Sequence, residues 1–169
     1  MLRYEAGNAV RLLKCGDEFF PALEAAIDAA QSEVHLQTYI FARDAIGQRI
    51  TAALLRAAQR GVAVRALIDD FGSDGFQDSA AAGALRDAGA RVLAFRPWRR
   101  WRWFTSGRLR RIHRKLAVID ARVAFVGGIN IQDDFDDPRS PLGRLDYAVQ
   151  VEGPVLATIH AAACSLWGA

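Results

Sequence analysis

The chain has 169 residues, of which 51% are hydrophobic, and a formal net charge of +3. This length and composition predict one globular domain over 1–169 with a sizeable buried core, and they argue against a disordered chain. The two cysteines, Cys15 and Cys164, fit no metal-binding spacing and are expected to be small buried hydrophobic residues. The N-terminus lacks the apolar run of a signal peptide, and residues 153–169 are too short and interrupted to span a bilayer, so membrane contact is expected to be peripheral.

The first half of the chain predicts strands alternating with helices. Strands are expected at 9–14, 32–41 and 62–68, and the last of them is a near-continuous apolar run, typical of a parallel strand buried on both faces. Helices are expected from 18 to 30, with Asp17 as N-cap, and from Asp44 to a stop at Gly61.

The same alternation continues to residue 95. Asp69 and Asp70 leave the third strand at its C-terminal end, which is the edge where open α/β sheets bind ligands. The further elements expected are a helix at 77–88, a strand at 91–95, a short helix or turn at 129–135, a strand at 145–151 and a helix from 153 to 167. Repeated strand–helix units predict an α/β fold with a largely parallel sheet and helices on both faces.

Residues 96–112 break the pattern, because arginines are interleaved there with Trp98, Trp101 and Trp103. Residues 96–115 hold nine basic residues and no acid, which leaves 13 basic against 19 acidic residues elsewhere, a net charge of −6. Guanidinium groups can bind phosphates while aromatic rings stack on bases or lie at the level of lipid headgroups. The alternative is a solvated basic loop whose tryptophans pack onto the domain.

The most informative stretch is 111–130, where polar residues interrupt apolar sequence of the strand type. On a strand, His113 and Lys115 would lie on one face. The apolar residues that follow are Ala117 and Ile119 on that face and Leu116 and Val118 on the other. Gly127 and Gly128 would let a bound group approach the backbone, and Asn130 could donate an N–H to it. A lysine repels cations and no second ligand has a suitable spacing, so the pattern favours an anion site, such as a phosphate site, over a metal site.

The spacing His-x-Lys-x4-Asp followed by Gly-Gly-x-Asn, carried by residues 113–130, resembles the signature of the phospholipase D superfamily. The alternative is a histidine satisfied within a buried strand. Nearly the whole chain resembles the N-terminal half of bacterial cardiolipin synthases, which join two phosphatidyl groups through glycerol. The matching stretches include 38–41, 60–62, 70–73 and 147–154. The resemblance implies an α/β/α sandwich with a mostly parallel mixed sheet and a single catalytic motif.

The resemblance also implies roles for individual residues. His113 would be the nucleophile that forms a phosphohistidine, Lys115 and Asn130 would stabilise the phosphate oxygens, and Asp146 would orient the histidine. Asp120 completes the motif and is expected to support the loop rather than touch the substrate. The residues expected to contact substrate are Gly127, Gly128, Arg111, Trp101 and Trp103. Neither a metal nor another cofactor is implied.

The family site needs two copies of the motif, yet neither His35 nor His160 is followed by x-Lys. The chain is therefore expected to pair with a second copy of itself, another chain, or a C-terminal half, and its end at Leu166-Trp167 resembles the end of a first half. The substrate would be a phosphatidylglycerol-like phospholipid, bound from the cytoplasm at the inner face of the cell membrane. The alternatives are a homodimeric phosphodiesterase that acts on nucleic acid and a non-catalytic lipid-binding module.

Overall fold

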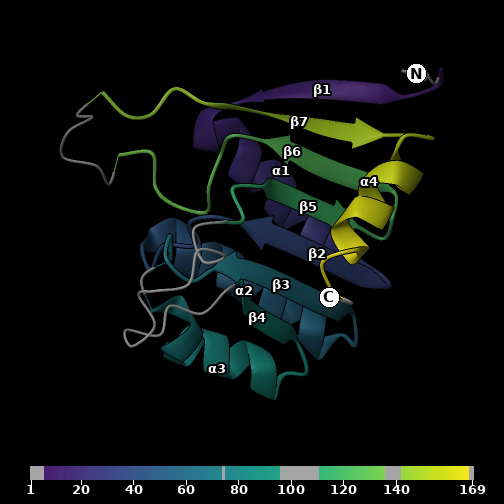
Figure 1. The fold of residues 1–169 in the computed structure, drawn as a ribbon. Coiled ribbons are helices and arrows are strands. Elements are labelled where there is room, and N and C mark those ends of the chain that lie inside the picture. Colours follow the sequence, from purple (N-terminus) through teal and green to yellow (C-terminus); the bar gives the residue numbers. More distant parts are fainter. Residues whose placement is uncertain (1–5, 74, 96–110, 136–141, 168–169) are drawn as a thin grey trace.

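The computed structural model describes residues 6–73, 75–95, 111–135 and 142–167, and their strands form a seven-stranded sheet (Figure 1). The strands are β1 (Ala9–Lys14), β2 (Glu33–Thr38), β3 (Ala63–Asp69), β4 (Arg91–Phe95), β5 (Lys115–Ile119), β6 (Val123–Gly127) and β7 (Tyr147–Glu152). The helices are α1 (Cys15–Ala29), α2 (Ala45–Gln59), α3 (Ala80–Asp87) and α4 (Leu156–Cys164), with a 3₁₀ turn at Phe76–Asp78. Residues 96–110, which carry Trp98, Trp101 and Trp103, lie outside the described residues.

The sheet is covered on both faces, as an α/β/α sandwich requires. Helices α1, α2 and α3 pack on one face over the larger core, which includes Ala117 and Ile119 of β5. Helix α4 lies on the other face over a smaller core with Leu116 and Val118 (Figure 1). The alternation predicted for this strand is therefore confirmed, since successive side chains point to opposite faces.

The sheet is mixed, as predicted, but the expectation that it is mostly parallel is wrong. In the order β1-β7-β6-β5-β2-β3-β4, only β2–β3 and β3–β4 are parallel pairs, and the other four neighbouring pairs are antiparallel. Parallel strands need a crossover connection, which α2 and α3 provide. The second half has hairpin connections instead, because β6, a strand that was not predicted, turns back directly along β5.

Local sequence explains where the elements begin and turn. Asp120 and Ala121, with φ angles of 52° and 50°, form the tight turn between β5 and β6, a left-handed conformation suited to two-residue hairpins. The Asp44 side chain accepts a hydrogen bond from the Gly47 N–H and caps α2, which begins where it was predicted. Asp17 does not cap α1, because that helix begins earlier, at Cys15, whose N–H donates to the Asp146 carbonyl.

One edge of the sheet gathers the residues of interest. In the strand register, Gln37 of β2 pairs with Leu116, Lys115 with Gly127, and Gly127 with Ala148. The end of β2, the start of β5, the end of β6 and the start of β7 therefore meet at this edge, on the left in Figure 1. The C-terminal ends of the parallel strands β2, β3 and β4 lie at the same edge, where α/β sheets bind ligands.

Candidate functional site

The centre of the site is the contact between Lys115 and His113. The Lys115 Nζ lies 3.2 Å from both ring nitrogens of His113 and 3.3 Å from its carbonyl oxygen. Tyr39 follows β2, and the centre of its ring lies 5.0 Å from the centre of the His113 ring. The same ring centre lies 5.4 Å from the Lys115 Nζ. Strand β5 begins at Lys115, so His113 lies just before the strand and its side chain is exposed. An exposed imidazole beside an ammonium group can meet a phosphate from solvent.

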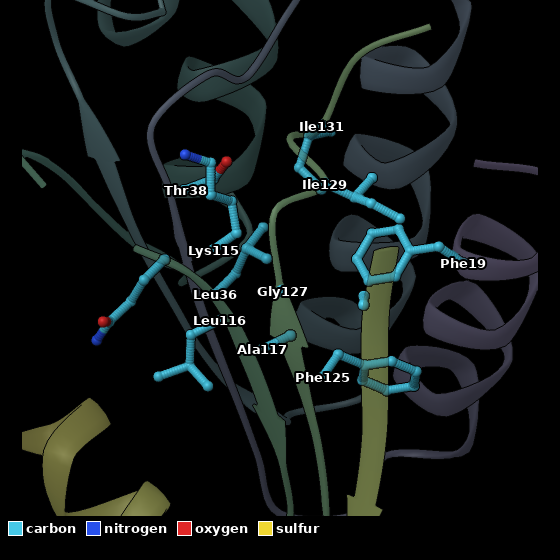
Figure 2. A pocket seen from close by; sticks show the side chains of 12 residues that line it. Phe19, Leu36, Thr38, Lys115, Leu116, Ala117, Phe125, Gly127, Ile129 and Ile131 are labelled. Atoms are coloured by element: carbon cyan, nitrogen blue, oxygen red, sulfur yellow. The ribbon is translucent and has the colours of Figure 1, made fainter. Parts of the chain in front are cut away.

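Lys115 is buried, and its amine contacts the exposed His113. Its stem belongs to the lining of a small cavity of about 10 Å³ that also includes Phe19, Phe125 and Ile129 (Figure 2). Burial lowers the pKa of Lys115, and the negative charge of Asp146 partly opposes this effect. The apolar packing fixes the amine at the sheet edge, since a packed stem loses its rotamer freedom.

Asp146 lies at the same edge, directly against Gly128. A Cβ atom at Gly128 would overlap the Asp146 carboxylate, and one at Gly127 would overlap Ala148 and the Tyr147 carbonyl in β7. The two glycines therefore make room for β7 and Asp146, and their contact with substrate stays a prediction. No hydrogen bond joins Asp146 to His113, both of which the structure describes; Oδ1 of Asp146 accepts instead from the Tyr147 N–H, at 2.7 Å.

Asn130 has a defined orientation. Its side-chain oxygen accepts a hydrogen bond of 3.1 Å from the Ile40 N–H, just after β2. Because the carbonyl end is used in this way, the amide nitrogen is the end that can donate to a bound anion. This orientation is the one that the predicted role of Asn130 requires.

Asp69 is a residue of the site whose function was not predicted. Its carboxylate is fully buried at the end of β3, and Oδ2 accepts a 3.0 Å hydrogen bond from the Ile112 N–H, next to His113. Oδ1 accepts from the N–H groups of Phe71 and Gly72. Asp69 thus fixes the backbone that carries His113. In the sequence, the only indication of this role is that a carboxylate follows an apolar strand at its C-terminal end.

Arg111 reaches the same edge, where its guanidinium carbon lies 4.7 Å from the centre of the Phe71 ring. Phe71 is 55% exposed, so this pair forms part of the surface beside His113. Trp101 and Trp103, the other side chains expected to bind substrate, lie outside the described residues. Contact of any of these residues with a substrate stays a prediction.

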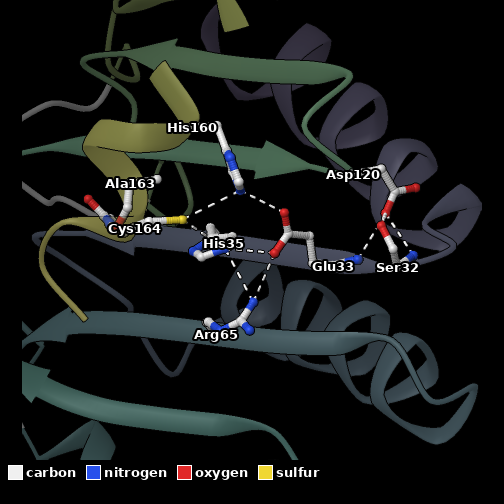
Figure 3. Close-up of polar contacts among 9 residues, drawn as sticks. Ser32, Glu33, His35, Arg65, Asp120, His160, Ala163 and Cys164 are labelled. Atoms are coloured by element: carbon white, nitrogen blue, oxygen red, sulfur yellow. Dashed lines mark hydrogen bonds and ion pairs between the residues drawn. The ribbon is translucent and has the colours of Figure 1, made fainter. Parts of the chain in front are cut away.

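Asp120 lies at the opposite end of β5 and is not part of the site. Its carboxylate accepts hydrogen bonds from the N–H groups of Gln31, Ser32 and Glu33 and from the Ser32 hydroxyl, at 2.8–2.9 Å (Figure 3). Burial alone would raise the pKa of Asp120, but these hydrogen bonds outweigh it and lower the pKa to about 2. The contacts agree with the structural role expected for this residue and speak against counting it among the catalytic residues.

The family model for "Cardiolipin synthase, PLD-like domain" matches residues 23–138, which is more than half of the chain. The chain belongs to the phospholipase D (PLD) superfamily. The match covers both blocks of the motif, from His113 to Asn130. The predicted relationship is thereby confirmed.

The relatives found by sequence are cardiolipin synthases. The chain is 44% identical over 156 residues to cardiolipin synthase B of Salmonella typhi and 38% identical to that of Escherichia coli K12. Each match covers 92% of this chain but 38% of the relative, so the chain spans well under half the length of these proteins.

Two solved structures show the same fold. They are Nuc of Salmonella typhimurium, described as a phospholipase D family member, with a TM-score of 0.68 and 18% identity, and NucT of Helicobacter pylori, with a TM-score of 0.72 and 14% identity. The matches cover 96% of this chain and 95% and 97% of the other two. Among the helices that the structure describes, none combines the length and apolar character needed to cross a membrane.

Proposed function

We propose that this chain is a PLD-type catalytic half-domain that transfers phosphatidyl groups through a phosphohistidine on His113. The observation that carries the proposal is the 3.2 Å contact between Lys115 Nζ and the ring nitrogens of an exposed His113. The cardiolipin synthase relatives support the same chemistry and a phosphatidylglycerol-like substrate.

In the first step, a ring nitrogen of His113 attacks phosphorus and the bond to the leaving alcohol breaks. The alkoxide takes a proton from an acid, and the phosphatidyl group stays on the histidine. In the second step, the hydroxyl of an acceptor alcohol attacks phosphorus, gives its proton to a base and breaks the P–N bond, which restores His113. The ammonium of Lys115 and the amide of Asn130 stabilise the charge on the non-bridging oxygens in both steps.

Asp146 acts as the orienting carboxylate in this scheme. Its negative charge already acts on Lys115, which contacts the imidazole. When a phosphate draws the ammonium away from the ring, the carboxylate can hold the histidine through the nitrogen that does not attack. Asp146 then stabilises the positive charge that develops on the ring.

The acid that protonates the leaving group must come from outside this site. His35 is buried on the α4 face of the sheet beside Val118, and His160 lies on α4, so neither is at the edge where His113 lies. A second copy of the chain or a second motif-bearing half would supply the missing histidine.

A phosphodiester with a p-nitrophenolate leaving group tests the proposal, because this group departs without protonation and the first step needs only one motif. The wild-type chain should release one equivalent of nitrophenolate per site in a burst and carry an acid-labile phosphoryl group afterwards. His113→Ala should give no burst, whereas Lys14→Ala, which removes an exposed lysine outside the site, should give the full burst. Phosphoryl transfer to protein in His113→Ala would refute the nucleophile.

Light scattering on the same sample shows whether the second motif comes from a second copy of this chain or from another polypeptide segment. A dimer that turns over continuously would mean that two copies complete one site. A monomer that stops after one burst would mean that another polypeptide segment supplies the second histidine, which is the base of the second step as well as the acid of the first.

We also propose that the basic and aromatic segment 96–112 binds an anionic membrane surface, at the inner face of the cell membrane, as a peripheral contact. The variant with Trp98, Trp101 and Trp103 replaced by Ala should bind phosphatidylglycerol vesicles less tightly than the wild type. Unchanged vesicle binding, together with tight binding of a single-stranded oligonucleotide, would favour the alternative phosphodiesterase that acts on nucleic acid.

A further inference from the structure

A second polar cluster lies under α4, on the face of the sheet opposite to Lys115. His160 and Cys164 come from α4, and Glu33 and His35 from β2 (Figure 3). The Cys164 Sγ lies 3.5 Å from Nε2 of His160 and 3.8 Å from Nε2 of His35. The carboxylate of Glu33 reaches both imidazoles, at 2.6 Å from Nε2 of His160 and 3.1 Å from that of His35.

The secondary structure brings these side chains together. Residues 160 and 164 are four apart and share one face of a helix, and residues 33 and 35 are two apart and share one face of a strand. His35 is 1% exposed, and its Nδ1 atom is buried without a hydrogen-bond partner. The other ring nitrogen, Nε2, faces Glu33, Arg65 and Cys164, so it is the atom of His35 that a ligand in the cluster can reach.

The distances from the Cys164 Sγ to the two imidazoles, 3.5 and 3.8 Å, come close to the edges of a tetrahedral metal site. Zinc binds sulfur at about 2.3 Å and nitrogen at about 2.0–2.1 Å, so in a tetrahedron the sulfur–nitrogen edge is about 3.5 Å and the nitrogen–oxygen edge about 3.3 Å. The donor atoms of His35, His160 and Cys164 all lie within 4.8 Å of one another. A cation bound between them would lengthen the 2.6 Å contact between Glu33 and Nε2 of His160 to about 3.3 Å through rotation of these side chains.

The charges also suit a divalent cation. A thiolate and a carboxylate supply two negative charges. Arg114 lies nearby, where it donates to the Ala162 carbonyl of α4, but the guanidinium that contacts Glu33 and His35 is that of Arg65. Its NH1 lies 3.0 Å from Oε2 of Glu33 and 3.3 Å from Nε2 of His35. With a metal on His35 and on Oε1 of Glu33, Arg65 would keep its ion pair with Oε2 and orient the ligand, as outer partners of metal ligands do.

We propose that His35, His160 and Cys164 bind a thiophilic divalent cation of the Zn²⁺ type, and that the Glu33 carboxylate, which contacts both imidazoles, shifts to become the fourth ligand. Four protein ligands close the coordination shell, which is typical of a structural site. The metal would tie α4 to β2, where the apolar core is small. The cluster shares no residue with the site at His113, so the proposal stands independently of the proposed function. The cysteine spacing gave no sign of it, because the ligands come from elements distant in the sequence.

Cobalt titration of the metal-free, tag-free chain tests the site, since Co²⁺ replaces Zn²⁺ and reports thiolate ligation through a charge-transfer band in the near ultraviolet. One equivalent of Co²⁺ should produce this band and the visible absorption of tetrahedral cobalt. Cys164→Ala should lose the charge-transfer band, whereas Cys15→Ala, which removes the other cysteine, should keep it. His160→Ala should weaken binding more than about 10-fold.

Thermal unfolding gives an independent measurement. Zn²⁺ should raise the midpoint of the wild type and of Cys15→Ala, and it should leave that of Cys164→Ala unchanged. The proposal is overturned if the wild type shows no charge-transfer band with Co²⁺, or if the band survives in Cys164→Ala and disappears in Cys15→Ala.

Discussion

The Asp146 carboxylate occupies the space that a side chain at Gly128 would fill. The glycine of the second motif block and the acid before β7 are therefore one structural unit. The absence of a Cβ atom just after β6 leaves the space in which a carboxylate lies just before β7.

Gly128→Ala should consequently damage the site through Asp146. The new methyl group must push the carboxylate away, and a displacement of this kind costs about 100-fold in rate. The burst rate with the nitrophenyl phosphodiester measures the effect. Gly83→Ala in α3, where a Cβ meets no atom within 4 Å, is the matched control and should keep the wild-type rate.

A double-mutant cycle checks the mechanism of that loss. If Gly128→Ala acts by moving Asp146, adding it to Asp146→Asn should reduce the rate little further. Fully additive losses would mean that Gly128 acts on the reaction by another route.

The pH dependence of the burst should reflect Lys115. Burial lowers the pKa of its amine, so the protonated form that stabilises the phosphate is lost at a lower pH than for an ordinary lysine, and the rate falls as pH rises. Lys115→Arg should be slower but should lack this alkaline fall, because a guanidinium stays protonated. Asp146→Asn removes the opposing effect and should shift the fall to lower pH. An identical alkaline fall in Lys115→Arg would assign it to another group.

Asp120 should matter for stability rather than for catalysis. Its folded pKa of about 2 lies below the ordinary value of 3.8, so its stabilising effect is present above about pH 4 and is lost as pH falls towards 2. Asp120→Asn should lower the free energy of unfolding by about 1–2 kcal/mol at pH 7, and the difference from wild type should shrink in acid. Urea unfolding measures it, with the exposed Asp87→Asn as control. A loss of burst activity without a loss of stability would contradict this assignment.

Asp69→Asn should release the backbone that carries His113. An amide cannot accept at both positions, so either the Ile112 N–H or those of Phe71 and Gly72 would face an NH₂ group. We expect the burst rate to fall about 10-fold or more, with a loss of stability of about 1–3 kcal/mol. Faster hydrogen exchange at the Ile112 amide would identify the cause. Asp78→Asn, on an exposed residue nearby, should change neither.

Much of the fold was predictable, because its signals are local. The strand β4 was predicted with its exact bounds, and the alternating faces of β5 followed from its apolar pattern. The hairpin between β5 and β6 was missed because Asp120 and Ala121 adopt positive φ angles without the glycine that usually signals such a turn. That omission led directly to the wrong expectation of a mostly parallel sheet.

In the site, too, some features could be predicted from the sequence and others could not. His113, Lys115 and Asn130 could be found from the motif, and the structure brings the side chains of His113 and Lys115 into contact. The role of Gly128 and the anchor from Asp69 to Ile112 depend on contacts between distant segments. Such contacts cannot be predicted from the spacing of residues along the chain.

The anchor at Asp69 also bears on how the chain can change. The backbone of Asp69 pairs with Phe95 in the β3–β4 register, and its carboxylate binds the Ile112 N–H, so the segment between 95 and 112 leaves and returns at a single residue. Doubling the length of a closed loop costs only about 0.6 kcal/mol in entropy. We therefore expect the nucleophile to keep its position when the length of the sequence between these two contacts changes, because Asp69 holds the residues on both sides of it.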